Sequence, residues 1–497
     1  MGILEQGKAP TGRLIRYAHV ALLACVVVAS LALRIHVSKQ CSLWLDEVWT
    51  LSDARAPWPE LLRGPSREHP PLMYLPVRLL LDLFGTSELV LRSVSLFFGC
   101  VLLVAVYLLC LELELTRTEA LVTVVSFALA PFFMRHAVEA RQYAMVSAFT
   151  TLELVFVLRL LRDPHHFPAL VGAALSSAGA ATTHYFGLAY ACCLLGVLAV
   201  GTFPSWRDAL KPARLRPRVV LVLGALALVL ALVALRAVWL FLFYRNYSTG
   251  PHPRALEGTI MSEFAFLPGR RGTAVQALLA GVGLALLGVR QRGIARVLPF
   301  AMGLPPLGLV LLLSSGHGVV PRYLAPSWVL YQLGSAATFV AVTRALRCSS
   351  RLWLKLLGTV SAAALVLVPL VLRVEAYPNG YGTGAAYYAG LQEYLASSRG
   401  RGTALVVYPS FPGAFIMRVG YPVKTPLVAL EHFQPVPGVR RYLVAEFEHA
   451  SRVHDLEALV EQQFHISRRE WRSLPLVRLE HTQFQVPVRA RVVYFHP

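Results

Sequence analysis

Long runs of apolar residues recur along the chain until about residue 373. Several of them reach the roughly 17 to 25 residues that a helix needs to cross about 30 Å of hydrocarbon. Only 15% of the residues are charged, and 56% are hydrophobic, whereas soluble globular proteins carry roughly 25% charged residues. The chain is therefore predicted to be an integral, mostly α-helical membrane protein, and a soluble multidomain enzyme is excluded.

The chain is strongly basic, with 47 Lys and Arg residues against 27 Asp and Glu residues. Such an excess suits either nucleic acid or anionic lipid. The basic residues cluster in short segments between the apolar runs, with no nucleic-acid-binding motif nearby, as expected if they meet phospholipid headgroups. We expect membrane lipid as a partner and no nucleic acid.

Hydropathy predicts eleven spanning helices. Their basic connections, near residues 159–162, 207–218, 290–296 and 344–355, all fall on one side, which the positive-inside rule makes cytoplasmic. The N-terminus is then cytoplasmic and the C-terminus lies outside. The predicted spans are 17–34, 90–111, 120–134, 142–161, 168–183, 185–202, 218–243, 274–290, 297–315, 323–343 and 355–373.

Two predicted outer segments are long, residues 35–89 and 244–273. Long loops commonly carry function. Within the first, LPVRLLLDLFG (residues 75–85) is too short to span a membrane and is expected to lie in the interface as an amphipathic helix.

The composition becomes that of an ordinary soluble protein after residue 373. Strand-like runs at 403–409, 441–448 and 488–495 alternate with helical stretches such as HDLEALVEQQF (454–464), which predicts a mixed α/β arrangement. We therefore expect two domains: a transmembrane catalytic domain over 1–373, and a small extracytoplasmic α/β domain over 374–497 that carries no catalytic motif.

The segment LWLDEVW (residues 43–49) places Asp46 and Glu47 just beyond the first span, between Trp44 and Trp49. Tryptophan favours the membrane interface. A carboxylate held there is partly desolvated and could deprotonate a hydroxyl. The alternative is a pair of solvated loop acids.

Further along the same outer loop, EHPPLMYL (residues 68–75) carries Glu68 and His69 before two prolines that forbid a regular helix start. The bend could aim both side chains at the cavity of Asp46, where His69 could donate to a phosphate oxygen. The alternative is a simple turn with exposed polar residues.

Three further motifs put polar residues at outer ends of predicted spans: MRHAVEARQYAM (134–145), THYFGL (183–188) and PRYLAP (321–326). Ionisable residues at membrane depth usually face a cavity, although those of the first motif could instead form salt bridges at the headgroups. Arg322 could clamp a phosphate bidentately. The candidate pocket residues are Glu139, Arg141, Tyr143, His184, Tyr185, Arg322 and Tyr323, whereas Arg92, Glu153 and Arg236 are interpreted as structural.

Taken in order, LWLDEVW, HPPLMYL, EARQYAM, THYFGL and PRYLAP resemble the bacterial glycosyltransferase family 39-like membrane proteins over about the first 345 residues. These are relatives of the dolichyl-phosphate-mannose protein mannosyltransferases and of the lipid A aminoarabinose transferases, with the GT-C fold. The resemblance implies an enzyme that transfers a sugar from a polyprenyl monophosphate, with inversion, to a lipid, glycan or protein acceptor outside the bacterial plasma (inner) membrane.

The resemblance also implies roles for residues. Asp46 matches the catalytic carboxylate of the family, Glu47 completes the pair, and Glu68 and His69 match the part of the loop that approaches the donor phosphate. Arg141 and Arg322 are candidates for stabilising the phosphate charge. Some relatives use a divalent metal ion, but this sequence shows no dedicated ligand set, so metal dependence stays open.

Two other functions are considered. A transporter or flippase of lipid-linked glycans would predict ionisable groups in the middle of several helices and internal repeats, and only Glu153 lies mid-span. A structural subunit that recruits envelope proteins through its C-terminal part would leave the outer-loop acids without a purpose.

Overall fold

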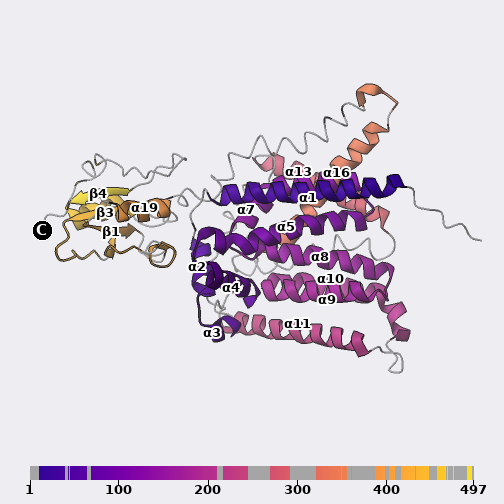
Figure 1. Cartoon of the computed structure of the whole chain (residues 1–497), viewed down its shortest axis with the longest axis horizontal. Helices are drawn as coiled ribbons and strands as arrows, with labels where there is room; N and C mark the ends of the chain where they lie inside the picture. The colour runs from indigo at the N-terminus through magenta and orange to yellow at the C-terminus, as the bar shows by residue number, and fades with distance from the viewer. Residues whose placement is uncertain are drawn as a thin grey trace, which may run out of the picture.

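The computed structural model describes residues 10–39, 43, 45–63, 69–209, 217–243, 269–291, 321–348, 350–354, 387–397, 402–408, 416–421, 423–430, 433–446, 456–465 and 490–494, with the isolated residues 357, 360, 467, 469 and 474. Its larger part is a bundle of helices, and a small sheet lies beyond one end of that bundle (Figure 1).

The bundle confirms a polytopic helical protein. Six described helices are long and apolar enough to cross a membrane, or seven if the bent pair α6 and α7 forms one span. The predicted number of eleven is not reached in the described residues: α9 has 17 residues, and the predicted spans 297–315 and, almost entirely, 355–373 lie outside them. The bundle helices are α1 (Pro10–Ser38), α5 (Glu88–Glu112), α6 (Arg117–Leu129), α7 (Pro131–Val138), α8 (Tyr143–Arg162), α9 (Phe167–Thr183), α10 (Tyr185–Ala209), α11 (Pro217–Phe243), α13 (Gly269–Arg290) and α16 (Ala325–Arg347).

Local sequence explains the break between α6 and α7. A capping box of Thr116 and Glu119 starts α6, satisfying two backbone groups that a helix N-terminus leaves without partners. Pro131 cannot continue that helix and holds Ala130 in an extended conformation (φ −66°, ψ 125°). The two helices consequently meet at a bend of 61°, and α7 leads directly into the EARQYAM segment.

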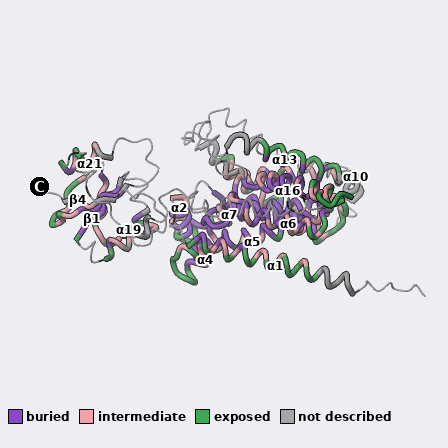
Figure 2. The backbone as a smooth tube through the Cα atoms, turned by 90° about the horizontal axis from the view of Figure 1, so that it is seen from above, coloured by how far each residue is buried: buried purple, intermediate pink, exposed green. Residues whose placement is uncertain are grey.

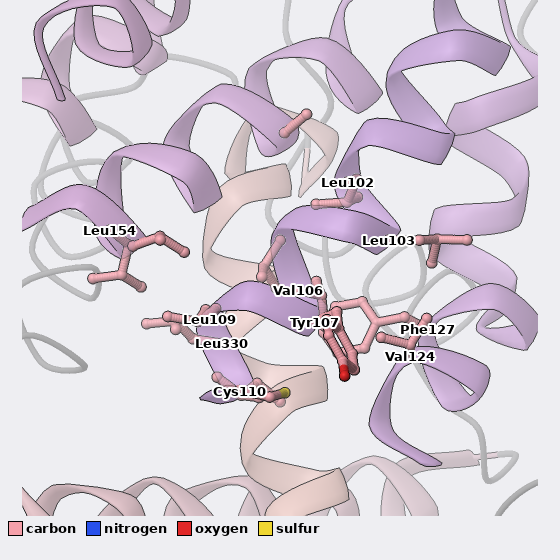
Figure 3. Packing of buried hydrophobic residues seen from close by; sticks show 14 of the residues in the cluster. Leu102, Leu103, Val106, Tyr107, Leu109, Cys110, Val124, Phe127, Leu154 and Leu330 are labelled. Atoms are coloured by element: carbon pink, nitrogen blue, oxygen red, sulfur yellow. The ribbon is translucent and has the colours of Figure 1, made fainter. Parts of the chain in front are cut away.

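The centre of the bundle is packed from α5, α6, α8 and α16. Figure 3 shows Leu102, Val106, Phe127, Leu154 and Leu330 in one continuous buried cluster. Since lipid tails are as apolar as leucine, close packing rather than escape from water holds such helices together. Small residues allow this approach where α13 meets α16: a Cβ on Gly283 would lie 1.8 Å from the backbone oxygen of Gly334.

Helices at the edge of the bundle expose apolar side chains. In Figure 2 the outward surface of α1 is largely exposed, and only 6% of the apolar window of α11 is buried. Exposed residues there include Val28, Leu221 and Leu235. A surface of this kind fits contact with lipid tails.

Short helices cover the end of the bundle nearest the sheet: α2 (Leu45–Ala54), α3 (Trp58–Arg63), the 3₁₀ turn η1 (Pro71–Met73) and α4 (Tyr74–Phe84). Helix α4 coincides with the predicted interfacial helix and exposes Leu79, Leu83 and Phe84. Residues 244–268 of the second long outer segment lie outside the described residues.

At the opposite end of the bundle, acidic side chains on α5 and α6 pair with the basic residues predicted to be cytoplasmic. Glu112 accepts from Arg159 at 2.7 Å and from Arg162 at 2.6 Å. Glu119 pairs with Arg344. The basic residues at these helix ends therefore lie at the end away from the sheet.

The sheet consists of β1 (Thr403–Tyr408), β2 (Leu427–Ala429), β3 (Arg441–Glu446) and β4 (Ala490–Tyr494), in the order β2-β1-β3-β4. Strand β1 runs parallel to β2 and β3, and β3 pairs antiparallel with β4. The predicted strands coincide with β1, β3 and β4, and the predicted helix with α21 (Leu456–Phe464). The proposed domain boundary near residue 373 lies outside the described residues.

Alternate residues of these strands face two different cores, as expected for a pleated sheet. On one face, Ala404, Val406 and Val444 pack with Val460 and Phe464 of α21. The other face joins a second buried cluster, in which strand residues meet α19 (Tyr387–Ala396) and the short helices at the end of the bundle: Leu405, Val407 and Leu443 share it with Leu391, Val48 and Leu51.

Candidate functional site

The site is centred on Asp46, which lies in the first turn of α2. Its Oδ2 atom is 2.8 Å from Nη2 of Arg322 and 3.9 Å from Nη2 of Arg141. The Asp46 side chain keeps 17% of its surface exposed, so it is accessible. One carboxylate and two guanidiniums leave an excess positive charge at this point.

Arg141 connects the two halves of the segment between α1 and α5. Its Nη1 donates to the backbone oxygen of Asp46 at 3.1 Å and to Oγ1 of Thr50 at 3.3 Å. Its Nη2 lies 3.2 Å from Nε2 of His69. Because a guanidinium can only donate, His69 accepts through Nε2 and carries its proton on Nδ1. His69 is therefore neutral in this arrangement.

His184 forms the next part of the wall, in the corner between α9 and α10. The backbone N–H of Phe186 donates to its Nδ1 at 3.1 Å, so the ring proton lies on Nε2. The rings of His184 and His69 are 5.2 Å apart, and that of Tyr143 lies 6.2 Å from His184. The guanidinium of Arg322 lies over the ring of Tyr143, with its Cζ atom 5.9 Å from the ring centroid.

Electrostatics keep both imidazoles neutral. Burial lowers the pKa of His184 to about 3, with further contributions from Arg141 and Arg322. Burial and the Arg141 charge likewise lower the pKa of His69 well below its ordinary value. Burial opposes the charge of Arg322, but Tyr143 and Asp46 raise the pKa of that guanidinium. The positive charge of the site therefore resides on its arginines.

Acid should weaken the folded protein because of these histidines. An unfolded histidine binds a proton near pH 6.5, whereas folded His184 does so near pH 3, so its contribution to stability is complete above 6.5 and is lost as the pH falls toward 3. We expect the melting temperature in detergent to drop over this range, and to drop less in His184→Asn. A wild-type melting temperature that does not change between pH 7 and 4 would contradict this expectation.

Glu139 is buried at the end of α7, and its charge is fully compensated. It contacts Nε of Arg135 at 2.9 Å and Nδ1 of His136 at 3.0 Å. Burial alone would raise the pKa of Glu139, but these two partners lower it to about 2. Glu139 is thus an ionised carboxylate held by Arg135 and His136 of its own helix, and we interpret it as a support for the Arg141 segment.

Glu47 is placed differently from its neighbour Asp46. It is fully buried, and its two oxygens accept from Nε and Nη2 of Arg92, both at 2.7 Å. Oε1 also accepts from the backbone N–H of Ala140 at 2.8 Å, and Arg92 Nη1 donates to the Ser38 oxygen at 2.7 Å. A carboxylate bound in this way joins α2, α5 and the EARQYAM segment, so its geometry favours a structural role over a catalytic one.

Replacing Arg92 with methionine should therefore strongly destabilise the protein. Removing one partner of a buried ion pair typically costs about 3 to 5 kcal/mol, because the other charge stays buried. We expect little monodisperse protein in size-exclusion chromatography and a lower melting temperature. Asp82→Asn is the matched control, since it also breaks an ion pair with an arginine, but the Asp82 side chain is 47% exposed and such pairs contribute little. Equal yields of both variants would contradict the prediction.

The other predicted residues are not all in this cluster. The Tyr185 hydroxyl accepts from Nε of Arg236 at 2.8 Å, which supports the structural interpretation of Arg236. Tyr323 lies in the 3₁₀ turn η4 (Pro321–Leu324). Its side chain, like residues Glu68 and Trp44, is not among the parts that the structure describes.

Two contributors were missed in the sequence. Thr50, which binds Arg141, follows Asp46 by four residues on one helix, and that spacing could have identified it. Tyr421, which contacts the start of α2 from the C-terminal part, has no motif around it.

The described residues contain no group of three or more His, Cys, Asp and Glu side chains that could hold a metal ion. Asp46, the central carboxylate, is instead engaged by Arg322.

The described residues thus form an apolar helical bundle with charged residues gathered at the end that lies next to a small sheet. The family model for dolichyl-phosphate-mannose-protein mannosyltransferases matches residues 68–239. That range contains His69, Arg141 and His184 but neither Asp46 nor Arg322. No curated protein shows a significant match.

Solved structures agree on the fold. ArnT from Cupriavidus metallidurans bound to undecaprenyl phosphate is 12% identical, with a TM-score of 0.55 over 98% of this chain and 98% of that chain. ArnT from the same organism in the apo state is also 12% identical, with a TM-score of 0.54 over 96% of this chain and 98% of that chain. The Archaeoglobus fulgidus oligosaccharyltransferase in the apo form is 13% identical, with a TM-score of 0.52 over 83% of this chain and 64% of that chain. The resemblance seen in the motifs is confirmed, and the chain has the GT-C fold.

Proposed function

We propose that this protein is a membrane glycosyltransferase that moves a sugar from a polyprenyl-monophosphate donor to an extracytoplasmic lipid, glycan or protein acceptor. The observation that carries the proposal is the group of Asp46, Arg141 and Arg322 at one end of the bundle, in which one accessible carboxylate lies between two guanidiniums. This group combines a base with an excess of positive charge for an anionic donor.

In this proposal, the donor phosphate binds between Arg141 and Arg322. Guanidinium forks match phosphate oxygens bidentately. His69 supports them as a neutral donor, because its Nε2 faces Arg141 and its Nδ1–H has no hydrogen-bond partner among the described residues. The ring of Tyr143 holds Arg322 from the other side. The phosphate thus meets fixed charges and dipoles, which need little reorganisation during the reaction.

Asp46 serves as the general base. It accepts the proton of the acceptor hydroxyl or amine, the acceptor atom forms a bond to C1 of the sugar, and the bond between C1 and the phosphate oxygen breaks. The electron pair of that bond leaves with the polyprenyl phosphate, whose added negative charge the two arginines stabilise. Attack opposite the leaving group inverts the configuration at C1.

The donor also prepares the base. Without it, Arg322 is paired with Asp46 at 2.8 Å. A phosphate that competes for Arg322 weakens this ion pair and leaves the Asp46 carboxylate accessible to the acceptor. Glu47 takes no part in the chemistry, because Arg92 and Ala140 already occupy both of its oxygens.

The relatives support the donor class. The family model that matches part of the chain is that of dolichyl-phosphate-mannose-protein mannosyltransferases. The similar ArnT structure holds bound undecaprenyl phosphate. We also propose the bacterial plasma membrane as the location, with the N-terminus cytoplasmic and the site and sheet outside. The arginine-rich helix ends around Arg159 and Arg344, away from the sheet, support this orientation.

The experiment is a transfer assay. Purified protein in lipid nanodiscs is mixed with a panel of polyprenyl-phosphate sugars and a native envelope extract, and mass spectrometry follows donor, free polyprenyl phosphate and glycosylated acceptor. We expect one donor to be consumed and an acceptor to gain that sugar. If folded protein binds a donor but leaves every donor intact, and moves it between leaflets of a vesicle instead, the protein is a flippase and the proposal is wrong.

A further inference from the structure

The C-terminal part of the chain packs directly on the helix that carries Asp46. Its π-helical turn η5 (Ile416–Gly420) lies against α2. A Cβ on Gly420 would lie only 2.9 Å from Cγ2 of Val48, which is fully buried two residues beyond Asp46. No side chain larger than hydrogen fits at Gly420 without displacing Val48, so the backbone of the turn is in close contact with α2.

The next residue, Tyr421, fixes the start of the same helix. Its buried hydroxyl accepts a hydrogen bond from the backbone N–H of Leu43 at 2.5 Å and donates to Oε1 of Glu88 on α5. Leu43 lies just before α2, which begins at Leu45. One hydroxyl from the C-terminal part therefore joins the approach to α2 to the first residue of a bundle helix.

The same helix is held from its other side by the bundle. Glu88 lies 4.0 Å from Arg92, the guanidinium that clamps Glu47. Between these polar contacts, Val48 and Leu51 share one buried cluster with Met417 and Leu443 of the C-terminal part. Asp46 thus lies on a short helix that is packed between the bundle and the sheet, and Figure 1 shows α2 at the end of the bundle nearest the sheet.

We propose that the C-terminal part is a positioning component of the catalytic site, with Gly420 and Tyr421 as positioning residues that set the location of the Asp46 carboxylate. This inference rests on the proposed role of Asp46 as base. A short helix in an outer loop has few contacts of its own, and a misplacement of about 1 Å in a reacting group can cost on the order of a hundredfold in rate.

The test uses the close contact at Gly420 in the full-length protein. We expect Gly420→Ala to lower kcat about tenfold by displacing α2, with the donor KM unchanged within about twofold because Arg141 and Arg322, which hold the phosphate, belong to segments other than α2. Val48→Ala removes the methyl groups that the new Cβ would meet, so the double variant should recover to within about threefold of Val48→Ala alone. Gly224→Ala is the control, since a Cβ there meets nothing within 4 Å.

A role limited to folding would give a different pattern. It would lower the melting temperature and the amount of folded protein, but kcat per folded molecule would equal that of wild type. Unchanged kcat in Gly420→Ala, or a loss that Val48→Ala does not restore, overturns the proposal. If Gly420→Ala fails to fold, Tyr421→Phe replaces it in the same assay, and it should also lower kcat about tenfold at constant donor KM.

Hydrogen exchange separates this inference from the proposed function. Tyr421→Phe removes both bonds of the hydroxyl, so peptides covering residues 43–54 should exchange their amides faster than in wild type, while peptides from α8 should not change. If wild-type protein transfers no sugar, the proposed function fails, and this exchange alone decides whether the C-terminal part holds α2. Equal exchange in Tyr421→Phe and wild type overturns the proposal.

Discussion

Replacing Asp46 with asparagine should lower the rate of sugar transfer by about a thousandfold, within the range of roughly 10² to 10⁴ that general base catalysis contributes. Asparagine keeps the size of the side chain but cannot accept the proton of the acceptor. Donor binding should not weaken, because the substitution removes the carboxylate that competes with phosphate for Arg322. The expected result is a fall in kcat with the donor KM equal to that of wild type or lower.

The measurement is the initial rate of acceptor glycosylation at several donor concentrations. Asp82→Asn is the matched control: Asp82 is also an aspartate in the segment between α1 and α5 that pairs with an arginine, but its side chain is 47% exposed on α4 and lies outside the cluster. Its rate should stay within about twofold of wild type, as for a surface ion pair. An Asp46→Asn enzyme that keeps a third or more of its kcat would remove Asp46 from the role of base.

The sequence could not distinguish Asp46 from Glu47. Neighbouring residues on a helix project roughly 100° apart, so one of the two must point elsewhere. Glu47 is the one that does so, because it pairs with Arg92, which is 45 residues further along the chain. The sequence around Glu47 does not reveal this distant partner. The different environments of these two acids therefore become visible only in three dimensions.

Some of the residues singled out from the motifs lie together in the structure. His69, Arg141, His184 and Arg322 come from four separate segments, and the structure brings them around Asp46. They were expected to lie at the same end of the bundle because each follows or precedes a predicted span, and the spans were assigned from their length and hydropathy alone. Near the site the predicted spans agree with the structure, since four of them coincide with α5, α8, α9 and α10.

Hydropathy was less informative about how a span is built. It merged residues 120–134 into one helix, whereas Pro131 separates α6 from α7 with a bend of 61°. The packing of the C-terminal part on α2 was not predicted either, since Tyr421 and Leu43 are 378 residues apart. A continuous apolar run such as ALVV (404–407) indicates a strand that is covered on both faces, but not which part of the chain covers it.

Replacing Arg322 with alanine should lower kcat/KM by about a hundredfold or more. Removal of one preorganised charge stabiliser costs about 10² to 10³ in other enzymes, and here the change would leave Arg141 to stabilise the phosphate with Asp46 competing for it. Arg322→Lys should recover only part of this loss, because an ammonium keeps the charge but not the planar fork. Both kcat and affinity should fall, in contrast to the effect on kcat alone expected for Asp46→Asn.

Two measurements check this difference: the transfer rate, and binding of undecaprenyl phosphate followed by native mass spectrometry. Arg347→Ala is the control, since Arg347 is an exposed arginine at the other end of the helix that follows Arg322, and neither quantity should change there. If Arg322→Ala binds undecaprenyl phosphate as wild type does, the phosphate does not contact this guanidinium. Arg322 would then act only by holding Asp46, and the phosphate site would have to be sought around Arg141 and His69.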